Sequence, residues 1–253
     1  MIVALLTAQR PEKRRKASMA DVISAIQLTL NADLERLRTI SQNLSNQGAP
    51  AYKRDQMIVE KFQAAYLSGA KLEPEFSLQK DFTQGAFKLT GNAMDIALDG
   101  EGFLMASSSD KTFFTRKGQM RLNPDGYLGL VTGERLLGRS GPIALNDADF
   151  VVQPDGSVVQ DGVVLDKLAV VTFQHPEQLS YAGAGLFENP TKQAPTEATG
   201  AQVMQSYLEM SNVNTMEEIV RLVELTRHYQ LSHNVLKAYD GSIDSAISTL
   251  GKF

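Results

Sequence analysis

The chain has 253 residues, of which 43% are hydrophobic and 21% charged, values typical of an ordinary folded protein with one medium domain plus appendages or two small domains. Its formal net charge of -4 provides no overall attraction to nucleic acid, so nucleic acid is not an expected partner. Cysteine is absent, which excludes disulfides, thiolate nucleophiles and cysteine-ligated metals.

The first 18 residues are expected to be a disordered extension. A short apolar run at residues 2–6 comes before the basic residues Arg10, Lys13, Arg14, Arg15 and Lys16. A secretory signal has the opposite order and ends in a cleavage site of small residues, so we expect no cleaved signal peptide here and regard Met19 as a second candidate start. No apolar run elsewhere reaches the length that spans a membrane, so direct membrane insertion is not expected.

A long helix is predicted between residues 19 and 48. Its apolar residues recur at steps of three and four, with Asp33 as the one break, and they are Ile23, Ile26, Leu30, Leu37, Ile40 and Leu44. This spacing is typical of a coiled-coil seam. Gly48 and Pro50 follow the segment, and both residue types end helices.

A second long helix is predicted between residues 215 and 253. Thr215 is a candidate capping residue, and Glu217 and Glu218 place acidic side chains in the first turn. The apolar seam positions are Ile219, Leu222, Tyr229, Leu236, Ile243, Ile247 and Leu250, and they alternate with the polar seam residues Thr226, His233 and Asp240. Polar residues at a seam weaken packing but can fix register and partner number.

The middle of the chain predicts strands and turns. Asp-Gly pairs, which favour positive φ in tight turns, separate short apolar runs at 99–100, 125–126, 155–156 and 161–162. Residues 157–160 and 163–173 indicate a hairpin around the last of these pairs. We therefore expect an all-β domain at 81–187, with extended linkers at 49–80 and 188–214.

These elements give an α+β fold class, in which long N- and C-terminal helices form a coiled coil attached to a central all-β domain. A helix with one apolar stripe is marginal in water, so each terminal helix needs a partner. A two-helix pair still leaves apolar surface for neighbouring copies, and a contact between unlike surfaces propagates as an open polymer unless it closes into a ring. The alternative is that the seams are simply an intramolecular core.

Three blocks of sequence resemble the flagellar rod and hook protein family. The first is Asn43, Leu44, Ser45 and Asn46, followed by residues 51–54. The second runs from 81 to 85, from 90 to 98 and from 100 to 103, with residues 114–118 similar to a strand of the family. The third is Ser211, Asn212, Val213 and Asn214, just before the last helix.

The resemblance implies a structural subunit of the bacterial flagellar basal-body rod, which polymerises axially as part of the drive shaft for motility. Its implied partners are itself, other rod subunits and the flagellar type III export apparatus, and its implied location is the periplasmic rod. About 26 residues separate Arg54 from Asp81, a short spacing that favours the proximal-rod type within the family. A distal-rod or hook-type subunit is the alternative.

The expected assembly interface consists of the helix seams and the two asparagine-containing blocks. Its residues are Ile23, Ile26, Leu30, Leu37, Ile40, Asn43, Leu44, Asn46, Ser211, Asn212, Val213, Asn214, Ile219, Leu222, Tyr229, Leu236, Ile243, Ile247 and Leu250.

Catalytic and ligand motifs are weak. Gly133, Gly138, Arg139 and Ser140 approach a phosphate-binding loop but lack its lysine, and the following Gly-Pro does not open a helix. Three histidines without metal-ligand spacing predict no metal site. No cofactor and no enzymatic activity are expected. A ligand-binding β module dimerised by its helices is the competing interpretation from another class.

Overall fold

The computed structural model describes residues 19–59, 76–109 and 111–250. These residues divide into two compact units, one formed by 19–35 with 225–250 and the other by 36–224 within the described ranges. The expected disordered extension at 1–18 lies outside the described residues.

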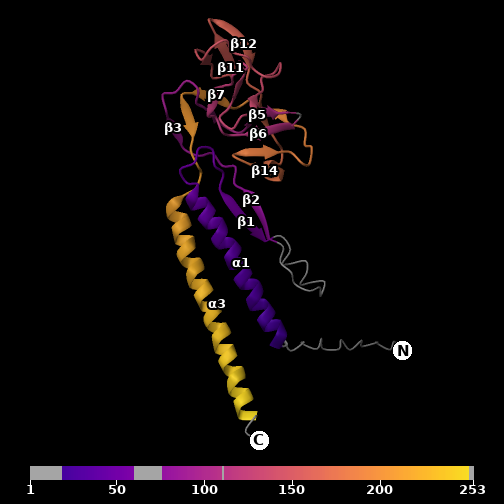
Figure 1. The fold of residues 1–253 in the computed structure, drawn as a ribbon, viewed down its shortest axis with the longest axis vertical. Coiled ribbons are helices and arrows are strands. Elements are labelled where there is room, and N and C mark those ends of the chain that lie inside the picture. The colour runs from indigo at the N-terminus through magenta and orange to yellow at the C-terminus, as the bar shows by residue number, and fades with distance from the viewer. Residues whose placement is uncertain (1–18, 60–75, 110, 251–253) are drawn as a thin grey trace, which may run out of the picture. The chain divides into compact units, whose positions relative to one another are not determined.

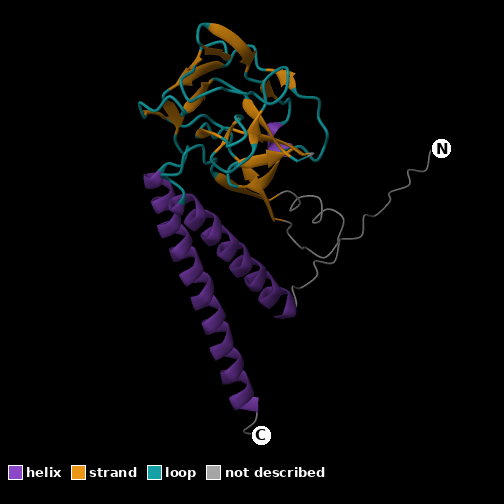
Figure 2. Cartoon of the chain, turned by 45° about the horizontal axis from the view of Figure 1, so that its top comes forward, coloured by secondary structure: helices purple, strands orange, loops and turns teal. Residues whose placement is uncertain are grey.

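Two α-helices stand near the two ends of the described chain (Figures 1 and 2). Helix α1 spans Met19–Ser45 and helix α3 spans Thr215–Leu250. The side chain of Asn214 caps α3, because its Oδ1 accepts a hydrogen bond from the backbone N–H of Glu217 at 3.4 Å. Helix α1 ends just before Gly48 and Pro50, as its sequence predicts.

The predicted fold class, with a coiled coil of the terminal helices, is wrong. The body is mostly β-sheet, and within the described residues the α-helical part consists of α1 and α3 alone. Several predicted seam side chains stay exposed, with Leu37 at 38%, Tyr229 at 40% and Ile219 at 42% of their accessible surface. A coiled coil requires one buried stripe. Helix α3 instead exposes further apolar side chains off the predicted seam, namely Val220, Val223, Leu231 and Val235.

The body is antiparallel in its described strand pairs. A nine-stranded sheet has the order β14-β15-β6-β5-β9-β8-β7, with β13 pairing with β5 and β16. Its strands are β5 (Phe103–Ser108), β6 (Lys111–Thr115), β7 (Met120–Leu122), β8 (Leu128–Leu130), β9 (Arg135–Leu136), β13 (Val170–Thr172), β14 (Ser180–Gly183), β15 (Leu186–Glu188) and β16 (Thr196–Glu197).

Smaller sheets complete the body, together with a 3-10 turn at Pro176–Gln178. A three-stranded sheet contains β10 (Val151–Val152), β11 (Ser157–Gln160) and β12 (Val163–Lys167). The remaining pairs join β1 (Asp55–Val59) to β2 (Phe76–Lys80), β4 (Ile96–Asp99) to β17 (Gln202–Gln205) and β3 (Phe87–Leu89) to β18 (Tyr207–Glu209).

The turn predictions are confirmed. The glycines of the four Asp-Gly pairs have positive φ, between 79° at Gly126 and 104° at Gly100. Strands β11 and β12 form the hairpin expected around Asp161-Gly162. The two segments expected to be extended linkers also contain paired strands: β1 and β2 lie within 49–80, and β16, β17 and β18 lie within 188–214.

Two apolar clusters fill the body. The larger joins β4, β5, β8, β9, β11 and β17, and its members include Ile96, Leu98, Leu104, Leu128, Leu130, Leu136, Val158, Leu168 and Val203. The smaller is aromatic, with Phe103, Phe114, Phe173 and Phe187 packed edge to face. Burial of these side chains is the main force that holds the strands together.

Candidate assembly site

The end of α1 is fixed to the body by Asn43. This side chain is fully buried, and its Nδ2 donates to the carbonyl of Asp55 at 2.9 Å. Its Oδ1 accepts from the backbone N–H of Asp55 at 2.9 Å and from the hydroxyl of Tyr52 at 3.1 Å. One amide group therefore satisfies both backbone groups of the first residue of β1 and locks the helix end to that strand.

A second set of contacts surrounds Asp55. The Tyr52 hydroxyl donates to Oδ2 of Asp55 at 3.0 Å, and Lys80 Nζ lies 2.8 Å from Oδ1 of the same carboxylate. Lys80 also lies over the Tyr52 ring, 4.8 Å from its centroid. Burial, followed by the nearby Asp55 carboxylate, raises the pKa of Tyr52 well above its ordinary value. The tyrosine is therefore held in its neutral, donating form.

Lys53, Arg116 and Glu209 form a buried ionic group. Lys53 Nζ lies 2.7 Å from Glu209 Oε1 and also donates to the carbonyl of Thr83 at 2.7 Å. Arg116 Nη1 lies 3.7 Å from Glu209 Oε2, and the backbone N–H of Gly85 donates to Oε1 at 3.0 Å. Burial lowers the pKa values of Lys53 and Arg116, and the Glu209 carboxylate opposes both shifts. The group joins four segments that are far apart in the chain.

The start of α3 is fixed in the same region. Arg54 Nε donates to Oε1 of the buried Glu218 at 2.5 Å, and Arg221 Nη1 lies 3.4 Å from the same oxygen. Asn212 accepts from the backbone N–H of Arg54 at 2.8 Å and donates to the carbonyls of Asp81 and Thr83 at 2.8 and 3.0 Å. The chain entering α3 is thus held by hydrogen bonds to the segments that flank β1 and β2.

We call this set of polar contacts the junction, defined by Asn43, Tyr52, Lys53, Arg54, Asp55, Lys80, Arg116, Glu209, Asn212 and Glu218. All of its residues belong to the unit formed by 36–224. Because buried ion pairs and amides are costly to separate, the junction resists any rotation of the two helix ends against the β body.

A separate polar contact joins the helices within the other unit. Nδ1 of His228 lies 2.7 Å from Oδ2 of Asp33, whose side chain is almost fully buried. Sequence periodicity marks Asp33 only as a break in an apolar series. In the structure, the Asp33 carboxylate instead contacts the side chain of His228 on α3.

The expected interface residues occupy different environments. Ile40 and Asn43 are buried, and half-buried positions are Ile23, Ile26, Leu30, Leu44, Asn46, Ser211, Asn212, Val213, Leu222 and Leu236. Leu37, Asn214, Ile219 and Tyr229 are exposed. The side chains of Ile243, Ile247 and Leu250 lie outside the described residues. Asn43 and Asn212, expected to contact other subunits, are thus hydrogen-bonded inside the chain.

Sequence reasoning did not find Glu209 or His228. Lys53 stands in the first block of the family resemblance, but its partner Glu209 lies 156 positions away. No local pattern marks that pairing. An acidic residue at the end of a strand is usually solvated, so its burial follows only from the assembled fold.

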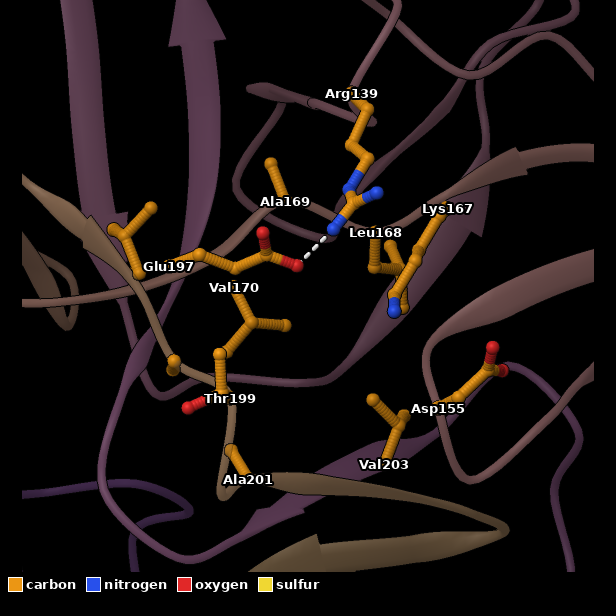
Figure 3. Close-up of a pocket in the computed structure, with 12 residues that line it drawn as sticks. Arg139, Asp155, Lys167, Leu168, Ala169, Val170, Glu197, Thr199, Ala201 and Val203 are labelled. Atoms are coloured by element: carbon orange, nitrogen blue, oxygen red, sulfur yellow. Dashed lines mark hydrogen bonds and ion pairs between the residues drawn. The ribbon is translucent and has the colours of Figure 1, made fainter.

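The body also has an open pocket of about 350 Å³ (Figure 3). Apolar side chains such as Leu168, Val170 and Val203 form part of its wall. Arg139 and Glu197 also line it and form an ion pair. The backbone N–H and hydroxyl of Ser157 donate to Asp155 and lower the pKa of that carboxylate. Three of the charged side chains that line the pocket, Arg139, Glu197 and Asp155, are thus engaged with neighbours in the chain.

Membrane-spanning helices and metal-binding clusters are both absent from the described residues. Neither described helix contains an apolar stretch that would cross a bilayer. In the same ranges, histidine and acidic side chains do not gather in threes around a position that would suit a metal ion.

Comparison with known proteins supports one family. The family model described as "Flagellar basal body rod FlgEFG protein C-terminal" matches residues 204–249. The chain is 29% identical over 238 residues to the flagellar basal-body rod protein FlgF of Caulobacter vibrioides, covering 89% of this chain and 95% of the relative. The FlgF protein of Rhizobium meliloti is 26% identical, covering 86% and 92%. These matches support the flagellar basal-body rod protein family, to whose members the chain is similar over most of its length.

Rod proteins of the FlgG type are also similar to this chain. The FlgG protein of Buchnera aphidicola subsp. Baizongia pistaciae is 24% identical over 256 residues, covering 83% of this chain and 92% of the relative. These similarities support a structural subunit of the flagellar basal-body rod rather than an enzyme. Within the unit 36–224, the junction fixes the end of α1 and the start of α3 to the β body.

Proposed function

We propose that this rod protein assembles axially with copies of itself and with other flagellar rod subunits through exposed apolar side chains of α1 and α3. The observation that carries the proposal is a set of exposed apolar side chains, with 38–53% of their accessible surface exposed: Leu37, Ile219, Val220 and Val223. All four lie in the unit formed by 36–224, in which the junction fixes the helix ends. Apolar side chains that remain exposed in one chain of an assembling family are suited to contacts with neighbouring subunits.

The junction supports this proposal. Association costs less when the contacting surface is already ordered, because fewer side chains and backbone segments lose freedom on binding. Asn43 and Asn212 hold the helix ends in one orientation relative to the β body. We infer that these asparagines act indirectly, by positioning the apolar side chains of the first turns of α3 and the last turns of α1.

The finer assignment follows the same proposal. We place the chain in the periplasmic rod, as a subunit that reaches it through the flagellar type III export apparatus. The short spacing of about 26 residues between Arg54 and Asp81 supports the proximal-rod type. The rod then forms part of the drive shaft for motility.

The first test is deletion of the chromosomal copy, with swimming and electron microscopy of basal bodies as readouts. Complementation uses the full chain and the chain that starts at Met19. Loss of rods that the full chain restores would support the proposal. Normal flagella in the deletion strain would contradict it. Rescue by the shorter chain would show that residues 1–18 are dispensable for assembly.

The second test separates assembly from folding. Leu37→Asp and Ile219→Asp change exposed side chains, so the purified chain should keep its stability within about 0.5 kcal/mol. Both variants should nevertheless lose swimming, because a charge at an apolar contact is costly once neighbours bury it. Gln42→Asp is the matched control, an exposed polar position on α1 that should swim normally. Wild-type swimming of both apolar variants would rule out these side chains as contacts.

A further inference from the structure

A smaller pocket of about 170 Å³ is lined by the turn that follows α1 and by the turn that joins β14 to β15 (β14 is labelled in Figure 1). All of its lining residues belong to the unit formed by 36–224. We call it the lysine pocket, because Lys53, Lys80 and Lys117 line it, while no acidic residue does so among the described residues. Positive charge in a concave site of this kind attracts anions.

Two of the three lysines are neutralised by acids that do not line the pocket. Lys53 Nζ lies 2.7 Å from the carboxylate of Glu209. Lys80 Nζ lies 2.8 Å from the carboxylate of Asp55. Lys117 is half-buried, and within the described ranges its ammonium group has neither a hydrogen bond nor an ion pair. Lys117 is therefore the charge that a ligand in this pocket can neutralise.

Tyr181 supplies a second donor beside Lys117. Its hydroxyl accepts a hydrogen bond from the backbone N–H of Gly185 at 3.3 Å, which leaves its own proton free to donate to a ligand. The Lys117 side chain approaches the same glycine, since a Cβ added to Gly185 would lie 3.6 Å from Cδ of Lys117. Lys80 Nζ adds positive charge 4.5 Å from the centroid of the Tyr181 ring. The two donors thus meet at one residue of the pocket wall.

The rest of the wall selects the kind of anion. Ala49, Pro50, Ala184 and Phe187 give the pocket an apolar side. A carboxylate accepts from both an ammonium group and a hydroxyl, and its aliphatic stem suits an apolar wall. The volume is well below the roughly 300–1,000 Å³ of pockets for drug-sized ligands. These features fit a short carboxylate such as the end of an acidic side chain.

We propose that the lysine pocket binds a carboxylate, with Lys117 as its ion-pair partner and Tyr181 as its hydrogen-bond donor. An acidic side chain of a neighbouring protein chain and a free small carboxylate share this chemistry. Binding itself does not depend on the proposed function, whereas delivery of the carboxylate by a neighbouring rod chain rests on it. A side chain bound there would hold the neighbour beside the turn that connects α1 to β1.

The first experiment titrates the purified full chain with propionate, which has the same end as a glutamate side chain. The readout is the NMR resonance of the Gly185 N–H, because this residue contacts both donors. Ionic strength is held constant, so that screening does not change during the titration. Propionate should bind at least about tenfold more tightly than its neutral analogue propionamide, since charge-assisted hydrogen bonds are roughly twice as strong as neutral ones.

Two lysine variants complete this experiment. Lys117→Met keeps the length of the side chain but removes the charge, so the response of Gly185 to propionate should be lost. Lys88→Met is the matched control, an exposed lysine on β3 outside the pocket, and it should leave the response unchanged. An equal response of the wild-type chain to propionate and propionamide, or no response to either, would overturn the proposal. A propionate response that survives in Lys117→Met would overturn it as well.

The second experiment identifies the source of the carboxylate. A carbodiimide activates a carboxylate, the Lys117 amine displaces the resulting urea, and an amide joins the two groups only where they are in contact. In purified basal bodies, peptide mass spectrometry should find Lys117 joined to an Asp or Glu of another chain, and unassembled chain should lack this product. Uncoupled Lys117 in basal bodies, together with propionate binding, would overturn delivery by a neighbour and support a free carboxylate. The Leu37→Asp and Ile219→Asp tests do not involve this pocket, so the proposed function is judged separately.

Discussion

Lys53 and Glu209 form an ion pair, with Nζ 2.7 Å from Oε1, in which both side chains are at most 1% exposed. The two residues come from opposite ends of the β body's sequence, one just before β1 and the other at the end of β18. Their ion pair joins the segment that precedes β1 to the end of β18. A charge that loses its partner at such a site cannot be solvated by water.

Removal of one partner should therefore be severe. Lys53→Met keeps the length of the side chain and leaves Glu209 buried with only part of its neutralising charge, so the free energy of unfolding should fall by about 3–5 kcal/mol. Urea denaturation measures the change. Lys111→Met is the control, because the Lys111–Glu188 pair is largely exposed and should contribute at most about 1 kcal/mol. Equal effects of the two variants would contradict the assigned role of the buried pair.

Asn43 should be far more important than Asn46, although both stand in one short motif. Asn43→Ala leaves the buried N–H and C=O of Asp55 without their side-chain partner, and the free energy of unfolding should fall by about 2 kcal/mol or more. The Asn46 side chain donates to Gln42 O at an exposed position, so Asn46→Ala should cost less than about 1 kcal/mol. Denaturation of the two purified variants distinguishes them. A smaller loss for Asn43→Ala than for Asn46→Ala would refute this reading.

Tyr52 gives a pH dependence with a defined sign. Its folded-state pKa is raised above the ordinary value of 10.0, chiefly by burial, so its neutral hydroxyl contributes stability that is complete below pH 10 and is lost as the pH rises further. Tyr52→Phe should cost about 1 kcal/mol at pH 7 and should weaken the alkaline loss of stability. Tyr127→Phe is the control. Denaturation curves at pH 7 and above pH 10 that have the same pH dependence in the wild type and Tyr52→Phe would contradict the assignment.

Two glycine-to-alanine changes should have opposite signs. A Cβ at Gly118 would lie 1.7 Å from the carbonyl oxygen of Ile96, so Gly118→Ala requires the backbone to move and should prevent cooperative folding of the β body. Gly241 lies inside α3 with open space around the added carbon, so Gly241→Ala should stabilise that helix by up to about 1 kcal/mol. Circular dichroism during thermal unfolding measures both. A Gly118→Ala variant as stable as the wild type would show that the strand contact is looser than it appears.

Local signals in the sequence predict much of the fold. Apolar spacing predicts helices where α1 and α3 lie, although Asn214 caps α3 in place of the expected Thr215. Asp-Gly pairs mark four turns with positive-φ glycines. These features depend on residues within a few positions of one another. The same holds for the β11–β12 hairpin, whose turn and strands are neighbours in the chain.

Long-range pairing escapes this kind of reasoning. Heptad spacing alone predicts a coiled coil, but spacing does not show that predicted seam residues such as Ile219 and Tyr229 stay exposed. In the same way, the asparagine blocks are recognisable in sequence, yet only the fold shows that Asn43 and Asn212 bind inside the chain. The partners of Asn212 lie more than a hundred positions away, and such pairing leaves no periodic trace in the sequence.

The pairing of β3 with β18 and of β4 with β17 has a consequence for the order of folding. These contacts join segments separated by more than a hundred residues, and such loops close late because they restrict the chain most. Until β17 and β18 arrive, β3 and β4 lack the partners that they have in the finished body. The β body should therefore finish folding in one late, cooperative step. In that step, β17 and β18 pair with β4 and β3, and the residues that lead into α3 become ordered together with them.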